Sequence, residues 1–558
     1  MKSFLLILGT VTTLRLALAA NIGEDPGLNG KKYSEAAGVF ADAVLQHGRD
    51  TYGTRHSPLF VDGLQVETLE PVRWKKKGQT WVLCNFASQQ ALLRTLDGLS
   101  ALTKDPRYRE AAEDATRYAL QHLRSTNGLL YWGGHMAWDL AQDRAVGQYP
   151  DVHEMKDHEP YYGLFWRVDA AATRELLGAI WAAHVLDWSL LDYNRHARTE
   201  RPGQPQWDHA FVENVEVPFP SVASNLSFAM VTPSLVDAGI TLALLDRNTN
   251  ALTWTRRLIY RWQQARDPKT GLSGGQLSYR QPDRAQEALG HVHPKINEAK
   301  IVASYHQVDR YHHLPLVQMQ AAEQLIAAGG QCADVGRDFI RWASEDLKTY
   351  ARYSFQPKTG LFISLMTDGT PIQWQQSRTN YYSPAAFAPI KADGCLFWSY
   401  AMAYRLTHDE AHWNMAQQLA RQLGLGEIGP SKAGKRQLQV DTVATDWHLI
   451  YALLELEQAT QDRGFFTLAC RIADSLLKTQ TPTGLFPRHG RLYARTGDEI
   501  PLALLHLAAA LDGKESLLPP AIFDNAFFHC DYDGPESPRR PGTDDNRTYD
   551  TIVFYGPN

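Results

Sequence analysis

The sequence predicts an all-α protein, an (α/α) toroid or barrel built from helical hairpins, with long loops and little β-structure. Three observations predict it. Amphipathic segments recur along the 558-residue chain, an Asn-Gly-Leu or Thr-Gly-Leu turn follows four of them, and short polar turns lead into further helices. Helical hairpins cannot bury their apolar faces alone, so repeated hairpins must pack on one another. An open α-solenoid is the alternative, and the irregular repeat lengths argue against tetratricopeptide and ankyrin arrays.

A glycine-leucine turn follows each of four predicted amphipathic helices. The helices are expected at 111–123, 254–266, 346–353 and 468–477, and the turns contain Gly128, Gly271, Gly360 and Gly484. Glycine readily adopts the positive φ angle that a helix C-terminus or a tight turn needs. In three of the turns a proline stands two or three residues before the glycine and prevents the helix from continuing.

A polar turn with an aspartate leads into each of three other predicted helices. Asp105, Asp409 and Asp498 precede helices expected at 108–120, 410–423 and 501–511. Aspartate can accept hydrogen bonds from the free N–H groups at a helix N-terminus. A further apolar helix is expected at 176–190, and Arg195 and His196 are expected at the end of it.

Composition and charge limit the classes of partner. The formal net charge of -5 argues against nucleic acid as the main partner. The 15 tryptophans and 24 tyrosines are typical of proteins that stack on sugar rings, although most aromatic side chains serve a core. The five cysteines are widely spaced, so neither a disulfide framework nor a cysteine-ligated metal is expected. Cys84, Cys395 and Cys470 have apolar neighbours and are predicted to be core residues.

The N-terminus predicts a signal peptide over residues 1–20. Lys2 supplies a positive charge, residues 4–14 are largely apolar, and 17–20 contain small residues suited to cleavage. The apolar run is too short to span a bilayer. We therefore expect a protein exported to the periplasm or secreted, with no membrane contact in its mature form. A catalytic domain at 21–530 and an irregular tail at 531–558 complete the expected organisation.

Three separated clusters carry the candidate chemistry. His135 follows two glycines, Glu154 lies in the run His-Glu-Met-Lys-Asp-His, and Arg195 directly precedes His196. The two histidines of that run are five residues apart, so the zincin motif H-E-x-x-H is excluded. Two imidazoles and a carboxylate can hold a divalent ion. They favour Mn, Co or Ni, with Zn as a further candidate, over Ca, which prefers oxygen ligands.

Together the clusters resemble the pectate lyases of polysaccharide lyase family 2, which have an (α/α) toroid fold. The resemblance implies that His135, Glu154 and His196 bind a transition metal and that Arg195 is the catalytic base. It implies a pectate lyase that cleaves polygalacturonate or oligogalacturonides by β-elimination to unsaturated oligogalacturonides. The residue chemistry agrees, because a metal on the uronate carboxylate stabilises the charge that develops when a proton leaves C5. Arg195 could instead polarise the carboxylate as a fork-shaped donor, since guanidinium holds its proton strongly.

Supporting roles and alternatives complete the prediction. Trp132 is a candidate stacking platform for sugar, and Lys156 is a candidate for binding a substrate carboxylate. His153 and His158 are expected to support the site from behind. One alternative is a toroid glycoside hydrolase acting on uronate oligosaccharides through an Asp/Glu pair, drawn from Asp139, Asp151, Asp157 and Asp187. The other is a non-catalytic exported sugar-binding helical protein.

Overall fold

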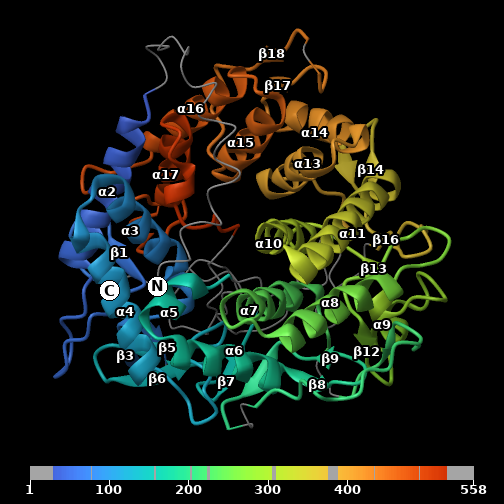
Figure 1. The fold of residues 1–558 in the computed structure, drawn as a ribbon, viewed down its shortest axis with the longest axis horizontal. Helices are drawn as coiled ribbons and strands as arrows, with labels where there is room; N and C mark the ends of the chain where they lie inside the picture. Colours follow the sequence, from blue (N-terminus) through green and yellow to red (C-terminus); the bar gives the residue numbers. More distant parts are fainter. Residues whose placement is uncertain are drawn as a thin grey trace.

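Helices arranged around a ring dominate the computed structural model (Figure 1). It describes residues 29–523, apart from 77, 156–158, 201–203, 223–225, 304–309, 375–386, 433 and 489–490. The predicted signal peptide at 1–20 and the tail at 531–558 lie outside the described residues. Within the described part of the chain, no helix is long and apolar enough to span a membrane.

The helices alternate along the sequence between an outer and an inner layer of the ring (Figure 1). The outer helices are α2 (Lys31–His47), α4 (Pro106–His122), α6 (Ala170–His184), α8 (Thr249–Gln264), α11 (Gly330–Ser354), α14 (Glu410–Gln422) and α16 (Gly464–Leu477). The inner helices are α3 (Gln90–Thr103), α5 (Tyr162–Val168), α7 (Thr232–Leu245), α10 (Leu314–Ala328), α13 (Gly394–Thr407), α15 (His448–Thr460) and α17 (Ile500–Leu511). Helix α17 packs on α2 and α3, so the ring closes. This confirms the (α/α) toroid and excludes the open solenoid.

The predicted turns have the expected backbone. Each of the four turn glycines has a positive φ, between 73° at Gly360 and 93° at Gly128. Asp105 and Asp409 cap α4 and α14 by accepting from Arg107 N and Ala411 N. Asp498 accepts from Ile500 N at the start of α17. The element before that last turn is a short strand, β19 (Tyr493–Arg495).

One helix prediction is wrong in its length. The apolar helix expected at 176–190 ends at His184, and the chain continues as the hairpin of β8 (Val185–Asp187) and β9 (Asp192–Tyr193). Asp187 Oδ1 accepts from the backbone N–H groups of Ser189 and Leu190, which closes a turn. Aspartate offers the backbone this alternative to helical hydrogen bonds. Arg195 and His196 therefore do not lie at a helix end.

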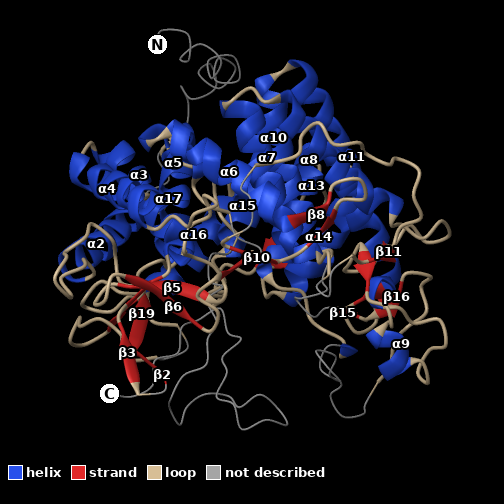
Figure 2. Cartoon of the chain, turned by 90° about the horizontal axis from the view of Figure 1, so that it is seen from below, coloured by secondary structure: helices blue, strands red, loops and turns tan. Residues whose placement is uncertain are grey.

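The strands are short and form small sheets. Figure 2 shows β2, β3, β5, β6 and β19 together on one side of the helices, with β11, β15 and β16 on the same side at the other end. Strands β4, β5 and β6 form a three-stranded sheet, and the other sheets among the described residues have two strands. The remaining bounds are β1 (Gly63–Gln65), β2 (Trp74–Lys76), β3 (Gln79–Trp81), β4 (Leu83–Cys84), β5 (Met136–Asp139), β6 (Arg144–Gly147), β7 (Val152–Glu154), β10 (His196–Arg198), β11 (Phe219–Pro220), β12 (Ser278–Tyr279), β13 (Ile301–Val302), β14 (Phe355–Gln356), β15 (Leu361–Phe362), β16 (Leu365–Met366), β17 (Gly426–Glu427) and β18 (Gln437–Leu438), with the short helix α9 (Arg284–Leu289).

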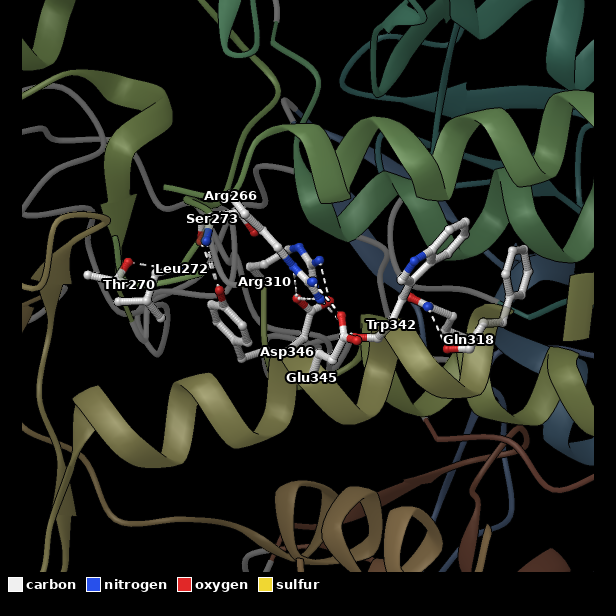
Figure 3. A network of polar contacts seen from close by, with 11 residues as sticks. Arg266, Thr270, Leu272, Ser273, Arg310, Gln318, Trp342, Glu345 and Asp346 are labelled. Atoms are coloured by element: carbon white, nitrogen blue, oxygen red, sulfur yellow. Dashed lines mark hydrogen bonds and ion pairs between the residues drawn. The ribbon is translucent and has the colours of Figure 1, made fainter. Parts of the chain in front are cut away.

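The core runs around the ring and includes the cysteines that the sequence assigned to it. Cys84, Cys395 and Cys470 are buried free thiols. A buried ion-pair network joins α11 to the chain after α8 and before α10 (Figure 3). The carboxylate of Asp346 is fully buried and accepts from Arg266 Nη2 and Arg310 Nη2, both at 2.6 Å. Loss of either arginine would leave the buried carboxylate of Asp346 with less positive charge beside it. A buried charge without a partner is costly.

Candidate metal centre

Two strands place Glu154 and His196 opposite each other. β7 pairs with β10 in antiparallel register, and Glu154 and His196 are directly paired residues. Directly opposite residues point to the same face of a two-stranded sheet, so their side chains meet. Met155 N also donates to Arg195 O at 2.8 Å, which extends the pairing by one bond. Residues 42 positions apart in sequence thus share one short ladder.

The Trp-Gly-Gly-His turn brings His135 to the same place. Gly133 forms an isolated parallel bridge with Glu154. Its φ is +120°, and a Cβ at this position would lie 2.6 Å from Glu154 O. Only glycine fits such a close backbone approach without strain. The turn then leads directly into β5, with His135 as the residue before it.

The donor atoms of these three residues converge. Nε2 of His135 lies 3.2 Å from Nε2 of His196 and 3.4 Å from Glu154 Oε2. Nε2 of His196 lies 3.2 Å from Glu154 Oε1. Donor atoms that each lie about 2.1 Å from one ion are separated from one another by about 3.0–3.4 Å in tetrahedral or octahedral geometry. The donor set and spacing therefore fit a divalent transition metal. This is the one such group of three among the described residues.

Burial and charge distinguish this cluster from an accidental surface group. The Glu154 side chain is fully buried, that of His135 is 9% exposed and that of His196 is 21% exposed. A buried carboxylate is costly unless positive charge compensates it. Such a site is closed behind the carboxylate and open on the side of His196.

Arg195 lies beside the cluster. Its Nε is 3.5 Å from Glu154 Oε1, and its side chain is 20% exposed. The guanidinium carbon lies 5.4 Å from the centre of the Phe228 ring, so an aromatic face supports it. The sequence analysis predicts Arg195 at a helix end, whereas in the structure Arg195 directly precedes β10.

Trp132 cannot be the stacking platform that the sequence suggested, because the side chain is fully buried. It packs against Phe86 and Phe165, and its Nε1 donates to His153 Nε2 at 2.7 Å. A buried indole offers no face to a sugar, so the predicted stacking role of Trp132 is wrong. His153 is also fully buried, behind Glu154. Lys156, Asp157 and His158 lie outside the described residues.

The aspartates proposed for a hydrolase have local structural partners. Asp139 is fully buried and accepts from Val82 N and Ala141 N. Its pKa is raised, chiefly by burial. Asp151 pairs with Arg198, and Asp187 closes the turn after β8. None of these three positions offers a carboxyl pair facing a common cleft.

A separate cavity of about 720 Å³ lies between inner helices of the ring, and none of the four site residues lines it. Glu159 and Asp237 face it together with Arg94. Burial raises the pKa of Glu159 to about 8 and that of Asp237 to about 7, and the charge of Asp237 further raises that of Glu159. Sequence reasoning missed both carboxyls, as it missed His184 and Asn194 beneath the candidate metal centre. No local motif marks any of them.

Known proteins resemble this chain in sequence. A family model described as periplasmic pectate lyase matches residues 57–531. The pectate disaccharide-lyase of Dickeya dadantii (strain 3937) is 27% identical over 556 residues, covering 94% of this chain and 96% of that protein.

Solved structures align with this chain at low sequence identity. Cellobiose 2-epimerase from Bacillus thermoamylovorans B4167 aligns with a TM-score of 0.41 and 9% identity, over 87% of this chain and 100% of that one. The family 76 α-mannanase BT2949 of Bacteroides thetaiotaomicron aligns with a TM-score of 0.39 and 10% identity, over 86% of this chain and 96% of that one. The sequence match extends through the centre built by His135, Glu154 and His196, and the chain belongs to the periplasmic pectate lyase family.

Proposed function

We propose that this protein is an exported, metal-dependent pectate lyase that cleaves polygalacturonate or oligogalacturonides by β-elimination. The observation that carries the proposal is the convergence of two imidazoles and a carboxylate beside an arginine. Family membership supports a pectate-degrading polysaccharide lyase. Mn, Co or Ni would suit the donor set best, with Zn as a further candidate.

His135, Glu154 and His196 would hold the ion. When bound, it would supply positive charge at the uronate carboxylate and so make the C5 proton more acidic. Two neutral imidazoles and one carboxylate leave net positive charge on a divalent ion, which suits an anionic sugar. The partial exposure of His196 leaves the open side for substrate.

Arg195 would act on the acidified sugar. Elimination removes the C5 proton, forms the C4–C5 double bond and breaks the C4–O4 bond, and O4 leaves after taking up a proton. Arg195 lies beside the carboxylate of Glu154, one of the proposed metal ligands. A uronate carboxylate bound to the ion would therefore be within reach of the guanidinium, which can bind it through parallel N–H groups. In the role that the family resemblance implies, Arg195 would instead accept the C5 proton, which requires its side chain to have lost its own proton first.

The assay that tests this function follows the double bond. Elimination gives a conjugated unsaturated uronate that absorbs ultraviolet light, whereas hydrolysis does not. We expect absorbance to rise when the purified protein is given polygalacturonate, to stop after chelation, and to return when Mn, Co, Ni or Zn is added singly. Metal content should be measured on each preparation.

Each rival has its own outcome. New reducing ends without absorbance would indicate a hydrolase and overturn the lyase proposal. Binding of polygalacturonate without any product would indicate the non-catalytic alternative. Full elimination by protein shown to be free of metal would leave a lyase but remove the metal from its mechanism.

A further inference from the structure

A chain of buried hydrogen bonds lies beneath the candidate centre. Trp132 Nε1 donates to His153 Nε2 at 2.7 Å. Nδ1 of His153 lies 2.8 Å from Nε2 of His184, and Nδ1 of His184 lies 2.7 Å from the backbone oxygen of Asn194. The first three side chains are fully buried, and Asn194 is 6% exposed.

The two ends of this chain determine the direction of every bond. An indole N–H can only donate, so His153 Nε2 accepts, and a carbonyl can only accept, so His184 Nδ1 donates. A neutral His153 then carries its proton on Nδ1 and donates it to the bare Nε2 of His184. All donors thus point from Trp132 towards Asn194, and both imidazoles have one defined tautomer.

Each segment that carries the centre contributes one residue to the chain. Trp132 stands in the turn 132–135, His153 stands in β7, and Asn194 stands in the segment 194–196. Asn194 also accepts from His196 N through Oδ1 at 2.9 Å, and its own N–H donates to His184 O at 2.9 Å. The last residue of α6 is therefore the point where the three segments are joined.

We infer that His153 and His184 are positioning residues, which hold the three site segments at the separation that the metal ligands need. The inference rests on the proposed metal-dependent function. Groups behind metal ligands orient the ligands, and their loss commonly lowers metal affinity by about 10–100-fold. Here the hydrogen-bond chain holds the backbone segments that carry the ligands rather than the ligand side chains themselves.

His184 offers a graded series of substitutions. His184→Phe keeps a planar ring and loses the hydrogen bonds to His153 and to the Asn194 oxygen. His184→Asn can retain the donor to the Asn194 oxygen, and His184→Gln can retain the acceptor for His153. His412→Phe is the matched control, because His412 is equally buried on α14 and bonds to Ser344 Oγ at 2.8 Å.

Two measurements are made on each full-length variant. The dissociation constant for Mn²⁺ and Zn²⁺ is measured by competition with a chelator. Hydrogen exchange is followed by mass spectrometry in peptides covering 132–135, 152–155 and 194–196. We expect His184→Phe to bind metal about 10–100-fold more weakly and to exchange faster in all three segments. The Asn and Gln variants should fall between it and the wild type, and His412→Phe should lower only the melting temperature.

The outcomes separate this inference from the proposed function. If the wild type binds metal and His184→Phe binds it equally well, the positioning role is wrong while the metal centre stands. If the wild type binds no metal, the proposed metal centre is wrong. The exchange data alone then test whether His153 and His184 hold the three segments together. Faster exchange confined to the end of α6 would overturn the inference in either case.

Discussion

At the residue scale, the centre depends on the buried carboxylate of Glu154. Its oxygens face Nε2 of His135, Nε2 of His196 and Nε of Arg195, within 3.2–3.5 Å. Such a carboxylate needs positive charge nearby, because desolvation penalises its ionised form. A divalent ion at the meeting point of the three donors would supply that charge.

His196→Ala tests the ligand set. The variant should lose bound metal and elimination activity, because one of three donors is gone, while its circular dichroism stays helical. His209→Ala, at an exposed histidine in the loop after β10, serves as the control and should keep both. Metal content by mass spectrometry and activity should be read from the same preparation. Full metal occupancy in His196→Ala would show that this residue is not a ligand.

Arg195 is tested by two substitutions. Arg195→Ala should keep its metal and lose turnover by about 10²–10⁴-fold, the usual effect of losing a general base. Arg195→Lys keeps the charge but loses the planar fork, so we expect it to be severely impaired as well. Arg174→Ala, at an exposed arginine on α6 that pairs with Asp246, should turn over normally. Near-normal turnover in Arg195→Ala would leave this arginine only a structural role.

At the element scale, the β7–β10 ladder and the turn at Gly133 assemble the centre. The ladder has three residue pairs, and the turn approaches it closely enough to exclude any side chain. Few backbone bonds hold so short a sheet, so its geometry depends on what packs beneath it. Small errors in either element would move the ligand atoms out of range of one ion.

Gly133→Ala tests that close approach. A methyl group at this position would meet Glu154 O at 2.6 Å, and the φ of +120° is unfavourable for alanine. We expect unfolding free energy to fall by about 1–3 kcal/mol and metal affinity to fall with it. Gly513→Ala has a positive φ of 65° but no atom within 4 Å of the added Cβ, so it should cost stability without changing metal affinity. Equal metal affinity in Gly133→Ala and the wild type would contradict the argument.

At the scale of the whole molecule, the ring closes where the first described outer helix, α2, packs on the last outer helix, α16, and the last inner helix, α17. Tyr33 Oη on α2 donates to the backbone oxygen of Cys470 on α16 at 3.0 Å. Closure leaves a cavity between inner helices, where carboxyl groups are held away from bulk water. That arrangement makes the stability of the ring depend on pH.

Glu159 and Asp237 contribute to that dependence with a defined sign. Their pKa values are about 8 and about 7 in the fold, while carboxyls in an unfolded chain titrate near about 4. Between these values the two carboxyls bind more protons in the folded state than in the unfolded state, so the stability that they contribute falls as pH rises from about 4 to about 8. Glu159→Gln should flatten the decline of melting temperature with pH, and Glu110→Gln, at an exposed residue on α4, should not. If the melting temperature of Glu159→Gln declines with pH as steeply as that of the wild type, the Glu159 carboxyl is not a source of the decline.

The helical toroid could be predicted from sequence because its signals are local. Turn glycines and capping aspartates act within a few residues, and Gly128, Asp105 and Asp409 do in the structure what their neighbours in sequence imply. The predicted helix at 176–190 extends beyond the end of α6 at His184, because the turn that Asp187 closes competes with the helix over the same apolar residues. Trp132 was misassigned, because an aromatic residue beside a candidate ligand has the same sequence signature whether it faces the cleft or the core.

The identities of the candidate ligands could also be proposed from sequence, because the resemblance to the pectate lyases of polysaccharide lyase family 2 implies them residue by residue. Their separations could not, because they depend on the register of β7 and β10, on the approach of Gly133, and on a chain of hydrogen bonds through His184. Strand register and buried polar chains are long-range properties, decided only when distant segments pack together. The sequence thus determined the helices, their turns and the chemistry available. Only the tertiary structure decided which atoms meet, since at the candidate centre that depends on His135 and His196, 61 positions apart, lying side by side.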